Sequence, residues 1–238
     1  MFVKITEEKS KKERKEDLQF EEERTNLNSM SFYFKSSGNE DDEDTLEREI
    51  NQIEEWTNLK YLPFKNNFSV LFDSDIFEYS QNNSTFDRHI IHYGIGKMAF
   101  IIETEKEKEK ENRFGIFLYP KIQYNYENKD NSYHPNGLVD NQSFMFSFNV
   151  NQNPMKFDLN EDSYSREVFF LHEKIDENLF SFGNEEICIG KKGRKSKFNH
   201  INQSLFNYRR NELISDDDLD ENNEFNVKRV IVLQFEDN

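Results

Sequence analysis

Hydrophobic and polar residues alternate most clearly along residues 142–150. Apolar side chains occupy every second position there, at Phe144, Phe146, Phe148 and Val150. Successive side chains of a β-strand leave opposite faces of the sheet, so this period of two predicts a strand with a row of rings on one face. Those rings are buried only if another sheet or a helix lies over them. The pattern therefore predicts a covered aromatic strand within a packed domain.

Several other apolar runs have the length of strands and are separated by charged or turn-forming segments. Residues 98–102 and 113–119 form a predicted hairpin with a charged tip at 105–112, and residues 155–157 are a predicted partner for the aromatic strand. Further strands are predicted at residues 68–72, 168–171 and 186–189. Many short strands and few helices predict a mainly β fold with flanking helices (α+β), arranged as a two-sheet antiparallel β-sandwich.

The last apolar run, residues 225–235, is apolar on both faces near its middle. Simple alternation divides it into two faces, one with Val230 and Val232 and the other with Phe225, Val227, Ile231, Leu233 and Phe235. A strand with two apolar faces is usually covered on both. We therefore expect a central strand, with helices outside the sheet.

A short helical or coiled-coil segment is predicted at residues 45–60, capped by Thr45 and ended by Pro63. Its apolar positions have heptad spacing, at Leu46, Ile50, Ile53 and Trp56. The seam is short for a coiled coil. Two arrangements stay open: the segment docks on the domain, or it self-associates through Leu46, Ile50 and Ile53.

A second helix is predicted between Ser84, as its N-cap, and Gly94, which follows its end. Asp87 lies three residues after the cap, and one face carries Phe86, Ile90 and Tyr93. The helix is therefore amphipathic and is expected to cover part of the core.

Composition and charge pattern divide the chain into three parts. Residues 1–44 are dense in charge and cannot bury enough apolar surface to form a core, so we expect a disordered arm or a fraying helix there. The segment at 45–60 follows, and residues 61–238 form the predicted domain. Only 34 % of the 238 residues are hydrophobic, but 24 are Phe, so large rings supply the core.

The overall charge and the single cysteine exclude several classes of protein. The net charge of −16 argues against a general affinity for nucleic acid or anionic membranes. One cysteine excludes an intrachain disulfide and a cysteine-based zinc site. The sequence has no secretory hydrophobic region and no apolar run of spanning length. We expect an intracellular, cytoplasmic protein, with the surface of endomembranes and the nucleus as alternatives.

Four features have the outline of a chemical site, and each has a simpler structural interpretation. His89 and His92 form a pair on the predicted helix without a recognised third metal ligand, and residues 73–75 (Asp-Ser-Asp) are a turn. Residues 190–196 do not have the spacing of a phosphate-binding loop, which leaves a basic patch for an acidic partner or a solvated loop. Cys188, flanked by two isoleucines, is expected to be a buried thiol. We assign no catalytic, cofactor-binding or metal-binding residue.

The order of several short motifs resembles that of the TLDc domain family. The resembling pieces span residue 68 to the C-terminus and lie at residues 70–75, 94–97, 101–104, 114–115, 140–148, 156–157, 182–183, 187–189 and 225–235. The strongest is the aromatic strand, placed between a Phe-Gly strand and a terminal apolar strand. The sequence departs from the family in two places. Residues 175–181, which precede the second Phe-Gly pair, are polar and bulky where family members tend to have glycines, and a Gly-Asn step of the family is replaced near 206–208. These differences affect loops more than the core.

The resemblance implies a β-sandwich flanked by helices and a non-enzymatic adaptor that binds protein partners without a cofactor. The family is linked to resistance to oxidative stress and, in several members, to binding of the vacuolar proton-pumping ATPase. It has no established reaction, so no catalytic residue is transferred. Two alternatives remain: a hydrolase or redox-active protein with an unseen site, and a nuclear transcription-associated factor that uses the basic loop at 191–197.

Overall fold

The computed structural model describes residues 40–61, 70–81, 85–93, 97–105, 112–120, 122, 138–148, 153–160, 167–172, 176–199, 204–214 and 218–236. The helices are α3 (Glu40–Thr57), α4 (Phe86–Tyr93) and α5 (Arg210–Leu213). The strands are β1 (Lys60–Tyr61), β2 (Val70–Asp73), β3 (Lys97–Thr104), β4 (Arg113–Leu118), β5 (Leu138–Val139), β6 (Phe144–Ser147), β7 (Met155–Asp158), β8 (Glu167–Leu171), β9 (Asn178–Phe182), β10 (Ile187–Gly190), β11 (Ser196–Phe198), β12 (Glu224–Phe225) and β13 (Val227–Glu236).

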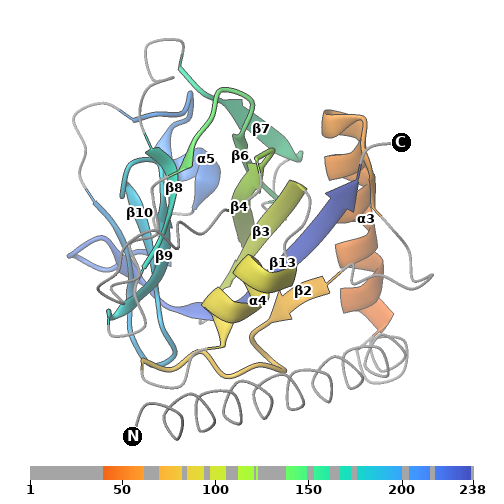
Figure 1. Cartoon of the computed structure of the whole chain (residues 1–238). Helices are drawn as coiled ribbons and strands as arrows, with labels where there is room; N and C mark the ends of the chain where they lie inside the picture. Colours follow the sequence, from red (N-terminus) through yellow and green to blue (C-terminus); the bar gives the residue numbers. More distant parts are fainter. Residues whose placement is uncertain are drawn as a thin grey trace, which may run out of the picture.

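The strands form two antiparallel sheets that face each other, which confirms the predicted β-sandwich (Figure 1). Sheet A has the order β1-β13-β3-β4-β6-β7, with β2 also paired to β13. Sheet B has the order β12-β11-β10-β9-β8-β5. The predicted hairpin is β3–β4, and the predicted partner of the aromatic strand is β7. Within the described ranges, no helix is long and apolar enough to cross a bilayer.

An inter-sheet core of apolar side chains fills the space between the sheets. Phe100 of β3 contacts Phe169 and Phe180 of sheet B, with ring centroids 4.8 and 5.4 Å apart. Phe86 of α4 stacks on Phe180 at 5.3 Å, so this helix extends the core as its amphipathic pattern predicts. The proposed cap Ser84 and the following Gly94 lie outside the described residues.

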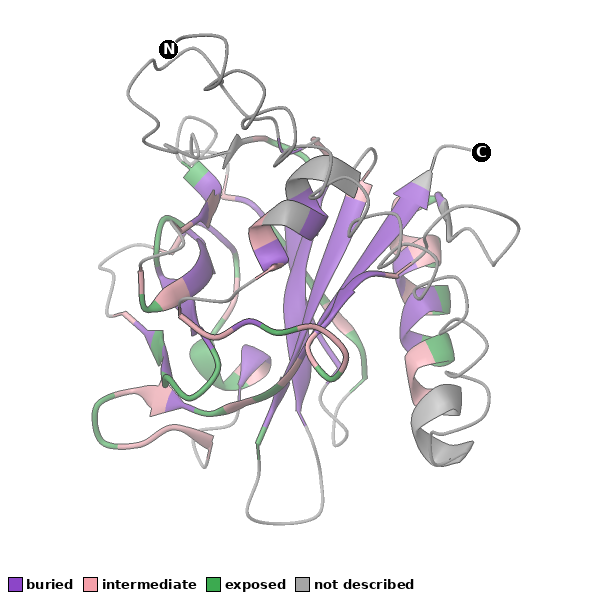
Figure 2. Ribbon diagram, turned by 60° about the horizontal axis from the view of Figure 1, so that its bottom comes forward, coloured by how far each residue is buried: buried purple, intermediate pink, exposed green. Residues whose placement is uncertain are grey.

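The outer face of sheet A is covered by α3. Ile50 and Ile53 are buried against the sheet, and the indole of Trp56 stacks on Phe148 with centroids 5.7 Å apart. In Figure 2 the buried residues of α3 line the side turned toward the sheet. The helix begins at Glu40 rather than at Thr45, so the predicted boundary was wrong. The heptad residues therefore pack within the chain, and self-association through them stays a prediction.

The aromatic strand β6 is covered on both faces, by two different layers. Phe144, Phe146 and the following Phe148 belong to the cluster under α3, whereas Met145 belongs to the inter-sheet core. Gly115 on the neighbouring β4 makes room for this row. A Cβ there would lie 1.8 Å from the carbonyl oxygen of Phe100 and 2.8 Å from the ring of Phe146, so only glycine fits.

Strand β13 is central, as predicted, but its faces are not those that simple alternation assigns. Its register against β3 shifts between Val227 and Arg229. A bulge inserts one residue and exchanges the faces on either side of it. As a result Val227 packs on the inter-sheet core, while Ile231 and Leu233 lie under α3. The predicted single face from 225 to 235 was therefore wrong in its first part.

Candidate functional site

His89 and the Asp-Ser-Asp turn at residues 73–75 take part in packing and ion pairing. His89 is buried in α4, with its ring centroid 4.2 Å from that of Phe77; the side chain of His92 lies outside the described residues. Asp73 is fully buried, and its Oδ1 accepts hydrogen bonds from Nε of Arg229 at 2.9 Å and from the amide of Asp75 at 3.0 Å. The described residues contain no group of three potential metal ligands.

Cys188 lies on the outer face of sheet B and is 8 % exposed. Desolvation raises the pKa of its thiol to about 11, since burial disfavours the thiolate. The sulfur contacts Nδ2 of Asn199 at 3.4 Å and the carbonyl oxygen of Glu185 at 3.5 Å. The thiol therefore remains protonated at neutral pH, which suits a structural residue rather than a nucleophile.

One arrangement that the sequence analysis missed has the residue types of a hydrolase triad. Nε2 of His172 lies 3.1 Å from Oγ of Ser181, and its Nδ1 lies 3.8 Å from Oδ2 of Asp176. Burial lowers the pKa of His172. However, Ser181 is 0 % exposed and the distance from His172 to Asp176 exceeds a hydrogen bond. The hydroxyl is therefore not placed to attack a substrate from solvent.

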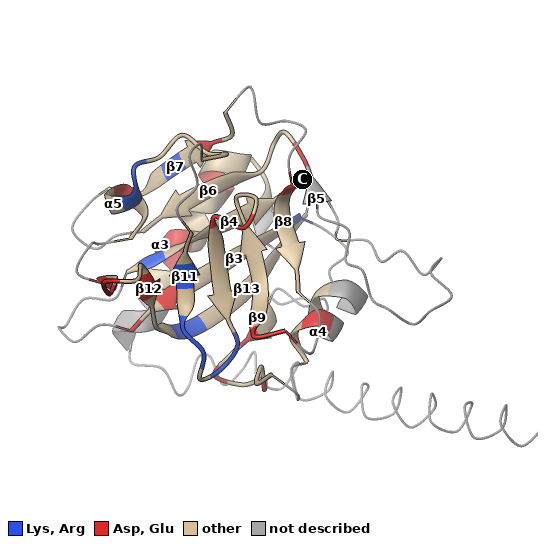
Figure 3. Ribbon diagram, turned by 90° about the vertical axis from the view of Figure 1, so that its left-hand side faces the viewer, with Lys and Arg blue, Asp and Glu red and all other residues tan. Residues whose placement is uncertain are grey.

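The basic loop at residues 191–197 lies near acidic segments of the chain (Figure 3). Ion pairs connect it to them. Lys192 lies 3.7 Å from Glu78 and Arg194 lies 3.1 Å from Glu177, while Lys195 pairs with Asp220. Lys191 is only 2 % exposed. Its Nζ donates a hydrogen bond to the carbonyl oxygen of Asp176 at 2.7 Å. The loop therefore connects segments of this chain. The side chains of Lys192, Arg194 and Lys195 are exposed, as expected of a solvated loop, and a basic patch for an acidic partner stays a prediction.

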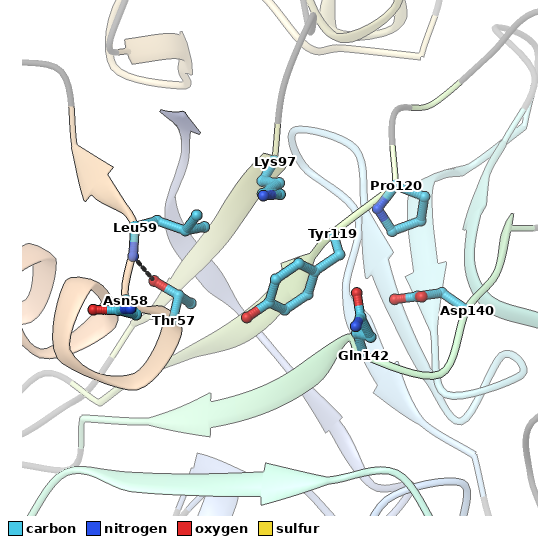
Figure 4. A pocket seen from close by; sticks show the side chains of 8 residues that line it. All are labelled: Thr57, Asn58, Leu59, Lys97, Tyr119, Pro120, Asp140 and Gln142. Carbon is cyan, nitrogen blue, oxygen red and sulfur yellow. Dashed lines mark hydrogen bonds between the residues drawn. The ribbon is translucent and has the colours of Figure 1, made fainter. Parts of the chain in front are cut away.

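A polar hollow of about 520 Å³ lies at the end of sheet A where α3 stops (Figure 4). It is lined by Thr57, Asn58, Leu59, Lys97, Tyr119, Pro120, Asp140 and Gln142. The end of α3, the start of β3, the end of β4 and the turn before β6 bring these residues together. Asn58 adopts a left-handed conformation with φ 57°, which ends the helix and turns the chain toward β1.

The hollow combines a cation, a carboxylate and an aromatic ring. Nζ of Lys97 lies 5.6 Å from the centroid of the Tyr119 ring, within reach of a cation–π interaction. Asp140 is held in place because its Oδ2 accepts a hydrogen bond from the backbone amide of Ser143 at 2.7 Å. Desolvation, followed by the charge of Asp140, raises the pKa of Tyr119, so the phenol keeps its proton and can donate a hydrogen bond. These groups can donate and accept hydrogen bonds and can pair with a charged group of a ligand.

The lining residues lie far apart in the sequence, and three of them, Lys97, Asp140 and Gln142, fall in motifs that the sequence analysis had singled out. Three loops are expected from the sequence to touch a partner, at residues 105–112, 123–141 and 191–197, because loops on a rigid scaffold usually hold the variable contacts. Residues 106–111 and 123–137 of the first two lie outside the described residues, and the third is the basic loop described above. No protein-family model matches the chain, and no curated protein matches it either.

Proposed function

We propose that this protein is a non-enzymatic adaptor of the TLDc type that acts by binding protein partners. The proposed partner is an assembled or partly assembled vacuolar-type proton pump, and the proposed setting is resistance to oxidative stress. The polar hollow at Lys97, Tyr119 and Asp140 is the observation that carries the binding role. Tyrosine is enriched at protein recognition surfaces, and Tyr119 is partly exposed at the hollow.

The positions of the resembling motifs support the family part of the proposal. Phe114 is buried in the inter-sheet core, and the adjacent Gly115 leaves room for the aromatic row. Phe182 is also buried, and Gly183 forms the β9–β10 turn with φ 71°. The motifs thus occupy positions where core packing or a tight turn requires those residue types.

A binding protein of this kind acts without making or breaking a bond. If the hollow fits one conformation of a multi-subunit pump better than another, binding shifts the equilibrium between them. The size of the shift is limited by the difference in affinity for the two states. The acidic chain and the mixed charges of the hollow make salt-dependent association the expected behaviour.

The hydrolase alternative has one observation in its favour, the contact between His172 and Ser181. The complete burial of Ser181 weighs against it. A Ser181→Ala variant separates the two proposals, because it should leave partner binding unchanged and abolish any serine-dependent hydrolysis.

The test of the proposed function is co-purification of the tagged full chain with pump subunits at low salt, alongside proton pumping in isolated vesicles. We expect capture of pump subunits and a change in pumping. The Lys97→Glu and Tyr119→Ala variants should lose at least tenfold in captured pump, since each removes a group from the hollow. Arg209→Glu, at an exposed position outside the hollow and outside the loops expected to touch a partner, is the charge-reversal control. Folded protein that neither binds nor changes pumping would refute the proposal.

A further inference from the structure

A buried cluster of charged side chains joins α3 to sheet A at the opposite end of the β3–β4 hairpin from the hollow. Glu49 of α3, Glu103 of β3 and Arg113 of β4 are exposed by 5 %, 2 % and 5 %. Glu103 and Arg113 are direct partners across the hairpin. The helix is therefore attached to the sheet partly through charges that have little contact with water.

Arg113 is shared unequally between the two carboxylates. Its Nε and Nη2 lie 3.1 and 3.0 Å from Oε2 of Glu103, and Oε1 of Glu103 lies 2.7 Å from Nζ of Lys228. The two oxygens of Glu49 lie 3.4 and 3.5 Å from Nη1 of Arg113. Strong charge-assisted hydrogen bonds are shorter, at roughly 2.7–2.9 Å. In place of its hydrogen bonds to water, the buried carboxylate of Glu49 thus has only long, weak contacts with Arg113.

The charged groups around Glu49 come from each element of the contact. Arg113 of β4 and Arg48 of α3 favour its carboxylate, whereas Glu103 of β3 repels it. Lys228 of β13 is partly exposed and pairs with Glu103. Desolvation outweighs these charges, so burial raises the pKa of Glu49 from 4.5 to about 7.

We propose that α3 is a pH-sensitive latch on sheet A, docked most tightly when Glu49 carries a proton and loosened when that proton is lost. The proposal rests on the buried, unequally shared cluster at the helix–sheet contact. Loosening of α3 exposes the rings of Phe144, Phe146 and Phe148, which the helix otherwise covers. This regulation does not depend on the proposed partner.

The direction of the pH effect follows from the two states of the helix. When α3 lifts, Glu49 returns to water and regains its ordinary pKa, so the docked state binds the proton more tightly. Docking is therefore strongest below pH 4.5 and weakens as pH rises toward 7. Between pH 5 and pH 8 this linkage lowers the docking equilibrium constant roughly 70-fold, with the loss complete above the docked-state pKa.

Native-state hydrogen exchange of the full chain measures this equilibrium directly. Protection factors of the α3 amides, corrected for the intrinsic pH dependence of exchange, should fall by more than tenfold between pH 5 and pH 8 relative to those of β3 and β4. Glu49→Gln keeps the shape and removes the charge, so it should make α3 protection independent of pH. Glu47→Gln, at an exposed position of the same helix, should retain the wild-type dependence.

A second measurement does not depend on the variants. The carboxyl carbon of Glu49 in the ¹³C-labelled wild-type chain should titrate near pH 7. Titration below pH 5, or α3 protection that is independent of pH in the wild type, would overturn the proposal. An unchanged pH dependence in Glu49→Gln would overturn it as well.

Discussion

The two apolar layers of this protein use the same residue types but have different boundaries. The inter-sheet core is enclosed by sheet A, sheet B and α4, and single buried polar groups such as Asp73, His89 and Glu186 border it. The layer under α3 is also rich in phenylalanine, but the buried cluster of Glu49, Glu103 and Arg113 lies at one end and the polar hollow at the other. Phenylalanine packing supplies the cohesion of both layers. The proposed pH-sensitive contact and the proposed binding site both lie at the charged boundaries of the second layer.

The largest effect is expected from the inter-sheet core. Phe180 is fully buried against Phe86, Phe100 and Phe169. Phe180→Ala should lower the free energy of unfolding by about 3–5 kcal/mol, because it removes apolar contact and leaves a cavity. Chemical denaturation followed by circular dichroism measures this change. Phe170→Ala, on the outer face of sheet B, is the control, and an equal cost at both positions would contradict the assigned core.

A smaller effect is expected under α3. Trp56 is partly exposed although it stacks on Phe148, so Trp56→Ala should cost about 1–3 kcal/mol. The same denaturation measurement, run beside that of Phe180→Ala, checks the difference between the layers. A cost equal to that of Phe180→Ala would show that the helix is as tightly integrated as the sheets.

The order of unfolding sharpens the comparison further. Trp56 is the only tryptophan and reports on α3, whereas Cys188 is the only cysteine and reports on sheet B. Reaction of Cys188 with a dipyridyl disulfide, a reagent that remains reactive toward thiols at acidic pH, measures the opening of sheet B. At pH 8, Trp56 fluorescence should change at a lower urea concentration than the one at which Cys188 begins to react. At pH 5 the two transitions should approach each other, because the proton on Glu49 strengthens docking. Coincident transitions at both pH values would count against a separate response of the helix.

The smallest effect is expected at the surface of sheet B. Lys195 pairs with Asp220 in solvent, and exposed ion pairs contribute little to stability. Lys195→Ala should therefore leave the denaturation midpoint unchanged within error at moderate salt. A clear loss of stability that disappears at high salt would show that the ion pairs of the basic loop contribute more to stability than their exposure suggests.

Much of the fold could be predicted because local alternation reflects burial. The aromatic strand, the hairpin, the β7 partner and the central place of β13 all follow from runs of apolar residues. Strand β9 was missed although Phe180 and Phe182 alternate correctly, because the polar residues before them masked the short pattern. The polar, turn-rich composition of residues 123–141 favours a loop, but Leu138–Val139 pairs with β8 as strand β5.

The sequence by itself determined which residues are apolar, where most strands run, and that one helix carries an apolar seam ending in Trp56. Only the tertiary structure decided which layer each face meets. The bulge in β13 exchanges its faces, and the seam of α3 meets its own sheet. The same holds for the sites, since Glu49 and Arg113 are 64 residues apart and Lys97 reaches the Tyr119 ring across a hairpin. Alternation is a local property of the chain, whereas contact, desolvation and pKa depend on what long-range pairing brings together.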